Sequence, residues 1–124
     1  MIVFFDELYG YMVFRAQGYL NTITGACVYD NEDFDYANHP DYIPIPKINS
    51  NYAQGFISEI TDKTLRRKLC SSLDNGSYSQ AFHMIITDNG LYSSWIDYVD
   101  NCDFEFARKW CESNGIKCVG RQKV

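Results

Sequence analysis

Residues 91–119 read LYSSWIDYVDNCDFEFARKWCESNGIKCV and carry the strongest structural pattern of the chain. Apolar or aromatic side chains recur in it every three or four residues, which is the spacing of one face of an α-helix. This row comprises Leu91, Trp95, Tyr98, Cys102, Phe106 and Trp110. The pattern therefore predicts one helix whose inner face carries both tryptophans of the protein as the spine of a core.

The end of this helix is marked by Asn114 and Gly115. Glycine readily adopts the left-handed conformation that closes many helices, so we expect the helix to stop there. Residues 116–119 then predict a short strand. The outer face of the helix has no base before Arg108. We expect an acidic strip on that face, formed by Asp97, Asp100, Asp103 and Glu105.

The length and charge indicate one acidic domain. A chain of 124 residues is a typical single domain, and folding buries roughly two thirds of the surface of the unfolded chain. Sixteen acids and eleven bases give a net charge of −5. Such a balance disfavours a phosphate-binding surface. We therefore expect a single domain over residues 1–124, and nucleic acid is a less favoured partner.

The first residues and the cysteines bear on where the protein acts. No apolar run approaches the roughly 20 residues that cross a bilayer, and residues 1–5 carry no base before Asp6 and Glu7. Five cysteines, an odd number without a Cys-x-x-Cys pair, fit buried reduced thiols better than a disulfide framework. We expect a cytoplasmic protein that makes no membrane contact. The sequence does not specify an oligomeric state.

Shorter elements precede residue 91. Residues 4–15 predict a short helix with Phe5, Leu8 and Met12 on one side. Residues 18–30 predict a β-hairpin, because two short apolar runs flank the turn residues 21–25. Residues 41–46, DYIPIP, predict an extended arm or edge strand, since each proline keeps the residue before it out of the helical region.

Helical spacing returns after residue 50. We expect one helix capped by Asn51, a second capped by Asp62, and a third that begins at Ser77 and ends at residues 88–90. In the second, four side chains should turn inward: Leu65, Leu69, Cys70 and Leu73. The predicted fold class is α+β: a helix-rich single domain of about four helices, with a small β-hairpin or antiparallel sheet joined by a short C-terminal strand.

Four motifs occur in an order that resembles a known family. They are Tyr19-Leu-Asn-x-x-Thr-Gly25, Asp41-Tyr-Ile-Pro-x-Pro46, Leu91-x-x-x-Trp95 and Trp110-Cys-x-x-Asn114-Gly-Ile116. In this order the chain resembles uncharacterised protein family 0158, a group of small bacterial proteins of unknown function. The resemblance implies several helices with a hairpin, and it implies no activity or catalytic residue.

One segment departs from that family. Its members usually read Gly-x-Gly-Ala-Phe-Arg-Arg-Phe, whereas residues 76–83 here read GSYSQAFH and lack the paired arginines. The resemblance therefore implies a divergent member, and any contact of those arginines with a polyanion is not expected here.

Acidic and aromatic residues alternate between residues 29 and 42, where Asp30, Glu32, Asp33, Asp35 and Asp41 are interleaved with Tyr29, Phe34, Tyr36 and Tyr42. Tyrosine is a frequent interface anchor, and an acidic surface complements the basic channels that grip nucleic acids. The leading hypothesis is a non-enzymatic interaction module that docks on a basic, nucleic-acid-handling protein. In its sharpest form it is a bacterial or phage inhibitor of the anti-CRISPR or DNA-mimic type. We expect its partner-binding acidic face to comprise the five acids with Tyr36 and Tyr42, together with the acidic strip of Asp97, Asp100, Asp103 and Glu105. An ordinary solubilising surface is the competing interpretation.

The bases suggest an alternative function. Only Arg15 and Lys47 precede Asp62, whereas Lys63, Arg66, Arg67 and Lys68 fall within six positions. On a helix these four side chains, here called the basic patch, can meet a phosphate-rich partner, although such runs are often just a solvated face. A nucleic-acid-binding module acting through the basic patch is therefore the second hypothesis.

A small enzyme of unrecognised class is the third hypothesis. Cys70 follows three bases, as a reactive thiol would, but its spacing predicts a core position. Glu59, Asp97 and Glu105 lack a pattern that signals an acid/base pair. His39 and His83 have no partner at metal-ligand spacing, and residues 30–35 fail the calcium-loop pattern. We expect no catalytic residue, no metal and no cofactor.

Overall fold

The computed structural model describes residues 1–49 and 51–120, which divide into two compact units. Unit 1 comprises Met1–Ile48 with Phe104–Val124, and unit 2 comprises Asn49–Asp103. The described residues form five α-helices, a three-stranded antiparallel sheet and a parallel pair of strands, so the predicted α+β class is confirmed. That residues 1–124 form a single domain remains a prediction, because the division into two compact units does not test it. None of the described helices is both long enough and apolar enough to cross a membrane.

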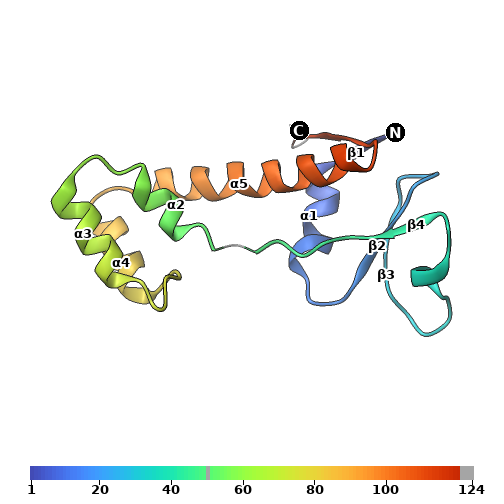
Figure 1. The fold of residues 1–124 in the computed structure, drawn as a ribbon, viewed down its shortest axis with the longest axis horizontal. Helices are drawn as coiled ribbons and strands as arrows, with labels where there is room; N and C mark the ends of the chain where they lie inside the picture. Colours follow the sequence, from blue (N-terminus) through green and yellow to red (C-terminus); the bar gives the residue numbers. More distant parts are fainter. Residues whose placement is uncertain (50, 121–124) are drawn as a thin grey trace. The chain divides into compact units, whose positions relative to one another are not determined.

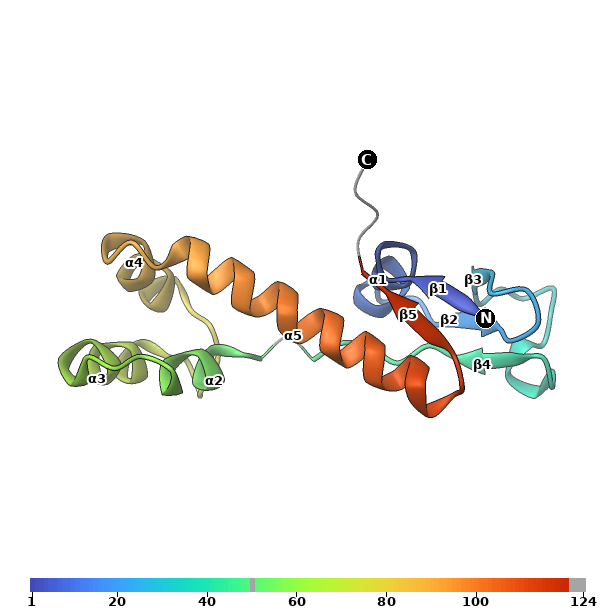
Figure 2. The same ribbon diagram turned by 90° about the horizontal axis from the view of Figure 1, so that it is seen from above.

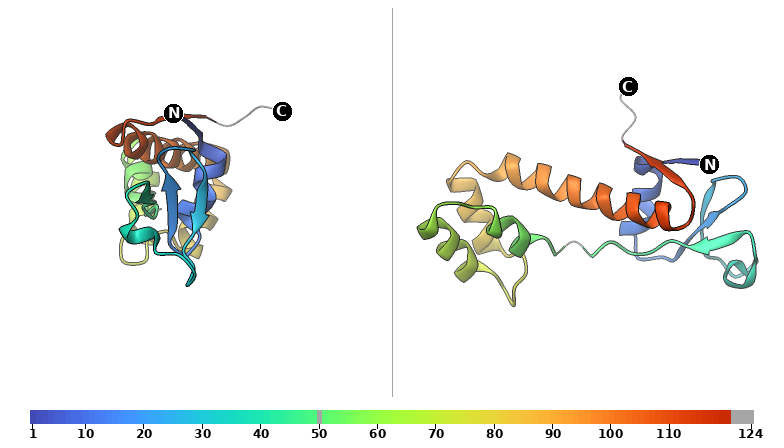
Figure 3. Two further views of the ribbon diagram at one scale, coloured as in Figure 1. Left: turned by 90° about the vertical axis from the view of Figure 1, so that its right-hand side faces the viewer. Right: turned by 45° about the horizontal axis from the view of Figure 1, so that its top comes forward.

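Unit 1 contains both sheets. Strands β2 (Gly18–Asn21) and β3 (Cys27–Tyr29) form the antiparallel hairpin seen in Figure 3, and β4 (Tyr42–Pro44) pairs with the other edge of β2. The hairpin and the edge strand are therefore where the sequence predicts them. The turn closes because Asn21 Oδ1 accepts hydrogen bonds from the amides of Ile23 (2.8 Å) and Thr24 (3.0 Å), and Gly25 takes a φ of 78°.

The last strand pairs differently from the prediction. Strand β5 (Lys117–Val119) lies parallel to β1 (Ile2–Phe4), and Figure 2 shows the two side by side. We expected this strand to join the hairpin sheet and expected no strand at the N-terminus. The reason is that β1 runs directly into helix α1 (Phe5–Val13), so three extended residues are hidden within an apolar run that also fits a helix.

The core of unit 1 is built on α1. Phe5, Leu8 and Met12 are buried on one side of this helix, as predicted, and they pack in one cluster with Ala107 and Cys111 of helix α5 (Tyr92–Ser113). The Lys47 ammonium donates to the carbonyls of residues 11, 14 and 16, which closes the end of α1. Lys47, one of the two bases that precede Asp62, therefore has a structural role.

Unit 2 is helical. Helices α2 (Ala53–Ser58), α3 (Lys63–Ser72) and α4 (Gln80–Asp88) pack with the first turns of α5 (Figure 1). Asp62 caps α3 as predicted, because its carboxylate accepts from the amides of Thr64 and Leu65. Asn51 does not cap α2, since the N-cap position is Tyr52. Helix α4 begins three residues later than predicted, because Ser79 and not Ser77 supplies the capping hydroxyl.

Helix α5 has a different buried row from the predicted one. Trp95 belongs to the unit 2 cluster, whereas Trp110 packs against the unit 1 cluster. The prediction of one spine carrying both tryptophans is therefore wrong. The reason is that Trp95 lies on the part of α5 that belongs to unit 2, whereas Trp110 lies on the part that belongs to unit 1. The fully buried positions near the end of the helix are Ala107 and Cys111.

Candidate functional site

The candidate site is the acidic loop, residues 30–41, which packs on a group of rings in unit 1. The aromatic cluster consists of Tyr19, Phe34, Tyr36, His39 and Tyr42. Tyr36 is central to it: its ring stacks on Tyr19 at 5.6 Å and meets Phe34 at 4.5 Å and Tyr42 at 4.8 Å. Such ring pairs stabilise an arrangement beyond the area they bury. The acidic loop therefore has a small aromatic core of its own.

Hydrogen bonds give the loop a defined backbone. The amide of Asp33 donates to Asn31 Oδ1 at 2.9 Å, and Asn31 forms an antiparallel bridge with Phe34. A short 3₁₀ turn, Tyr36–Asn38, follows, and the amide of Asp41 donates to Nδ1 of His39 at 3.1 Å. These local contacts constrain the backbone that carries the carboxylates of the loop.

The carboxylates of the acidic loop point to solvent. Asp30, Glu32, Asp33 and Asp35 are exposed, and Asp41 is half-buried. Asp35 accepts a hydrogen bond from the side-chain amide of Asn38 at 2.8 Å. Within residues 1–49 and 51–120, no base comes within ion-pair distance of any of these five acids. The loop is an acidic surface whose charge is not neutralised by the described part of the protein.

Rings lie among these carboxylates. Phe34 remains 42% exposed although it contacts three other rings, and Tyr36 and Tyr42 are half-buried. Phe34 and His39 were not singled out as site residues from the sequence. The alternation of acids and rings from residue 33 to residue 36 is the signal that places Phe34 there.

The predicted acidic strip on α5 is only partly formed. Asp97 and Glu105 are exposed and Asp100 is half-buried, but Asp103 is buried with 3% of its surface accessible. The prediction that Asp103 belongs to an exposed strip is therefore wrong. Its side chain accepts a hydrogen bond from the Tyr52 hydroxyl at 2.7 Å, which satisfies a polar group that would otherwise be costly to bury.

Glu105 differs from the loop acids because it is ion-paired. Arg108 reaches Glu105 at 2.9 Å and Glu112 at 2.8 Å. The hydrogen bond from Arg108 is the largest cause that lowers the pKa of Glu105 below its usual value. The charge of this part of α5 is thus largely compensated within the helix.

The basic patch is exposed throughout, since Lys63, Arg66, Arg67 and Lys68 all lie on the outer side of α3. Arg66 is engaged locally, because its Nε donates to the carbonyl of Ile60 at 2.9 Å and so caps the chain after α2. Asp62 precedes the patch in the chain, but its carboxylate accepts hydrogen bonds from the amides of Thr64 and Leu65 as the helix cap. In the described residues, none of the four bases forms an ion pair.

Cys70 is exposed, so its predicted core position is wrong. On α3 the fully buried position is Leu69, and the next residue is rotated by about 100° towards solvent. Cys70 borders a pocket of about 390 Å³ with Gln54, Ile57, Leu73 and Gly76. Cys111 and Cys118 are buried, whereas Cys27 and Cys102 are half-buried. Burial raises the pKa of Cys27 to about 11 and that of Cys111 to about 12. Thiols whose pKa is raised in this way are poor nucleophiles.

The remaining chemical candidates are two histidines with aromatic neighbours and three exposed carboxylates. His83 contacts Tyr78 through Nδ1 and packs edge-on against Tyr92, while His39 belongs to the aromatic cluster. Glu59 is exposed, as are Asp97 and Glu105. Across residues 1–49 and 51–120, no three histidine, cysteine or acidic side chains are arranged to hold a metal ion.

No protein-family model, curated protein or solved structure matches the chain.

Proposed function

We propose that this protein is a non-enzymatic interaction module whose acidic loop docks on the basic surface of a nucleic-acid-handling protein. The observation that carries the proposal is the combination, in one ordered loop, of four exposed carboxylates without an ion pair in the described chain and an exposed ring, Phe34. A loop that served solubility alone would not need its own aromatic cluster. A surface that must keep its shape against a partner does.

The sharper form of the proposal is an inhibitor of the anti-CRISPR or DNA-mimic type. Carboxylates spaced along an ordered loop offer a basic channel the same kind of charge as successive phosphates. We further propose that the protein acts in the cytoplasm, which agrees with five free cysteines. Membership of uncharacterised protein family 0158 is also a proposal, and it adds no activity.

The proposal is tested by affinity capture of partners with the full chain as bait. The test variant replaces Asp30, Glu32, Asp33 and Asp35 by Ser, and a matched control replaces Asp97 and Glu105 by Ser. We expect the wild-type chain and the control to capture a basic, nucleic-acid-handling protein, and the loop variant to lose it. Capture should weaken as salt rises, because exposed charges are screened over roughly 8 to 10 Å at ordinary ionic strength.

Competition separates docking at the nucleic-acid site from docking elsewhere. If the partner cannot bind its nucleic acid and this protein at the same time, the inhibitor form of the proposal is supported. Simultaneous binding would restrict the proposal to a docking module. Recovery of no basic partner, or capture that survives the four loop substitutions, would overturn it.

A second candidate function is nucleic-acid binding through the basic patch. It is favoured by one observation, the four exposed bases on α3 without an ion pair in the described residues. Replacing Lys63, Arg67 and Lys68 by Gln should then abolish a salt-sensitive mobility shift with DNA or RNA. Arg66 is left in place in this variant because it holds the carbonyl of Ile60. The absence of any shift at low salt with the wild-type chain would eliminate this candidate.

A further inference from the structure

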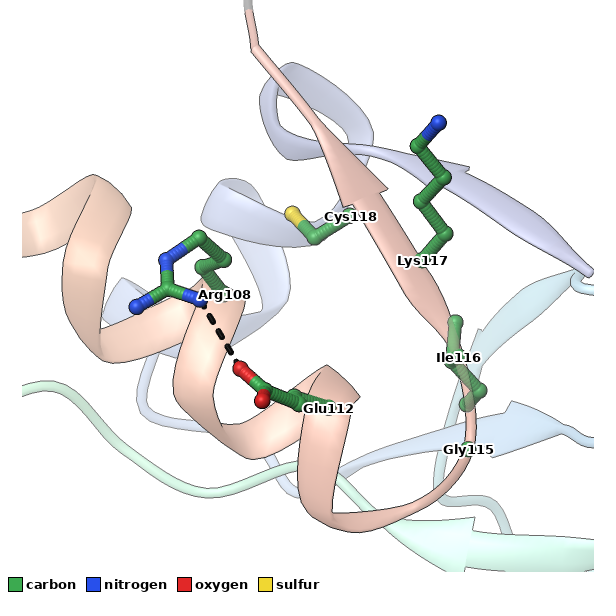
Figure 4. Close-up of a pocket in the computed structure, with 6 residues that line it drawn as sticks. All are labelled: Arg108, Glu112, Gly115, Ile116, Lys117 and Cys118. Atoms are coloured by element: carbon green, nitrogen blue, oxygen red, sulfur yellow. Dashed lines mark hydrogen bonds and ion pairs between the residues drawn. The ribbon is translucent and has the colours of Figure 1, made fainter.

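A pocket of about 570 Å³ lies in unit 1 between the last turns of α5 and strand β5. Figure 4 shows its lining, in which the helix contributes Arg108 and Glu112 and the turn and strand contribute Gly115, Ile116, Lys117 and Cys118. The sequence gives no sign of this pocket, because its two walls are joined only by the left-handed turn at Gly115, whose φ is 70°. The acidic loop is not part of its lining.

One edge of β5 borders this pocket and carries free peptide groups. In the described chain β5 has one neighbouring strand, β1, and the Lys117 amide donates to the carbonyl of Met1 at 3.1 Å. Peptide groups of successive strand residues point to opposite sides, so the amide and carbonyl of Cys118 point away from β1. Among the described residues, no acceptor takes the amide proton of Cys118. A backbone donor of this kind at a strand edge is available to an added strand.

The side chains of β5 define what a neighbouring strand would meet. Ile116 and Cys118 are buried on one side and Lys117 is exposed on the other. Arg108, which also lines the pocket, is already paired with Glu112 and Glu105. Lys117 forms no ion pair in the described chain, so it is the cation of this pocket that remains without a counter-charge.

We infer that this pocket and the free edge of β5 bind an extended segment of a partner protein by strand addition. The segment alternates apolar side chains, which enter the pocket beside Cys118, with an acidic side chain that lies next to Lys117. Main-chain hydrogen bonds to Cys118 supply affinity, and the cross-strand pair with Lys117 supplies selectivity. This inference stands apart from the acidic loop and does not rest on the proposed function.

The inference is tested with the full chain and three probe peptides. The first alternates valine and glutamate, the second alternates valine and lysine, and the third is the glutamate peptide methylated at alternate backbone nitrogens. Amide signals of the ¹⁵N-labelled chain locate binding, and fluorescence anisotropy measures affinity. We expect the glutamate peptide to shift the amides of residues 116–119 and to bind about fivefold more tightly than the lysine peptide.

Two variants sharpen the test. Lys117→Glu should reverse the preference between the two peptides, and it is an exposed position where folding is not at risk. Lys109→Glu removes the same charge from an exposed position outside the lining and should leave the preference unchanged. The methylated peptide should not bind, because it cannot complete the main-chain hydrogen bonds. Equal binding of the methylated peptide, no shift at Cys118, or an unchanged preference in Lys117→Glu would overturn the inference.

Discussion

The acidic loop and the outer face of α5 have similar residues but hold their carboxylates in different ways. In the loop, four carboxylates are exposed and none is ion-paired within the described residues. On α5, Asp103 is buried against the Tyr52 hydroxyl and Glu105 is bound by Arg108. A segment rich in acids therefore does not always form an acidic surface. The hydroxyl and guanidinium groups nearby decide which carboxylates remain available to a partner.

The largest expected difference between the two regions concerns stability. Asp103→Ala should lower the free energy of unfolding by about 2 to 3 kcal/mol, because it removes a buried acceptor and its hydrogen bond from the Tyr52 hydroxyl. The matched control, Asp97→Ala on the exposed side of the same helix, should change it by no more than about 0.5 kcal/mol. Denaturant unfolding measures both, and equal losses would remove the distinction between the buried and exposed acids.

A smaller effect is expected at the aromatic cluster. Tyr36→Ala should destabilise the chain by about 1 to 2 kcal/mol, because three ring contacts are lost. Amide hydrogen exchange should show lost protection in residues 30–42 and unchanged protection in unit 2. Loss of protection in unit 2 of the same size would contradict the view that the cluster supports the loop locally.

The cysteines give a kinetic test of the same fold. At pH 8 one thiol, Cys70, should react with iodoacetamide well ahead of the others, since it is exposed while burial raises the pKa of Cys27 and Cys111. Cys70→Ser should remove the fast phase, as followed by mass spectrometry. A fast phase that persists in this variant would show that another thiol is accessible.

The buried thiol of Cys111 also predicts a pH dependence. Its pKa is raised from the usual 9.0 to about 12, so the unfolded chain releases its proton first as the pH rises. Stability that is fully present below pH 9 should therefore fall between pH 9 and pH 12. Cys111→Ala should lower overall stability but flatten this part of the profile. A profile that keeps its full slope in the variant would assign the effect to other groups.

The smallest effect is expected at the ion pairs of α5. Arg108→Gln should raise the pKa of Glu105, because the hydrogen bond and the positive charge that lower it are lost. Any stability from this pair is present above the ordinary pKa of a glutamate and is lost as the pH falls through the lowered value. Carboxyl NMR titration measures the change. An unchanged Glu105 pKa would mean that Arg108 does not hold it in solution.

Local signals allowed much of the fold to be predicted from the sequence. The helix of Phe5, Leu8 and Met12, the hairpin around Asn21, and the cap at Asp62 each depend on residues close in the chain. The edge strand at residues 42–44 follows from its prolines. Such features are specified by spacing and turn chemistry, so they need no knowledge of the tertiary structure.

The parts that could not be predicted depend on distant partners. Strand β5 was predicted, but strand β1 and the pairing of the two were not, because they are three residues each and lie at opposite ends of the described chain. The burial of Asp103 requires Tyr52, and the division of α5 between two clusters requires both units. Within the candidate site, the acids and Tyr36 were named from the sequence, whereas the role of Phe34 depends on rings that only the fold brings together.

The central claim is that the acidic loop, and not acidity in general, binds a basic surface. The most direct measurement is an NMR titration of the ¹⁵N-labelled full chain with an oligoarginine peptide, recorded for the wild-type chain and for the variant with Asp30, Glu32, Asp33 and Asp35 replaced by Ser. We predict amide shifts concentrated at residues 30–36 in the wild-type chain and their loss in the variant. Shifts of equal size around Asp97 and Glu105, or shifts at the loop that survive the substitutions, would contradict the claim.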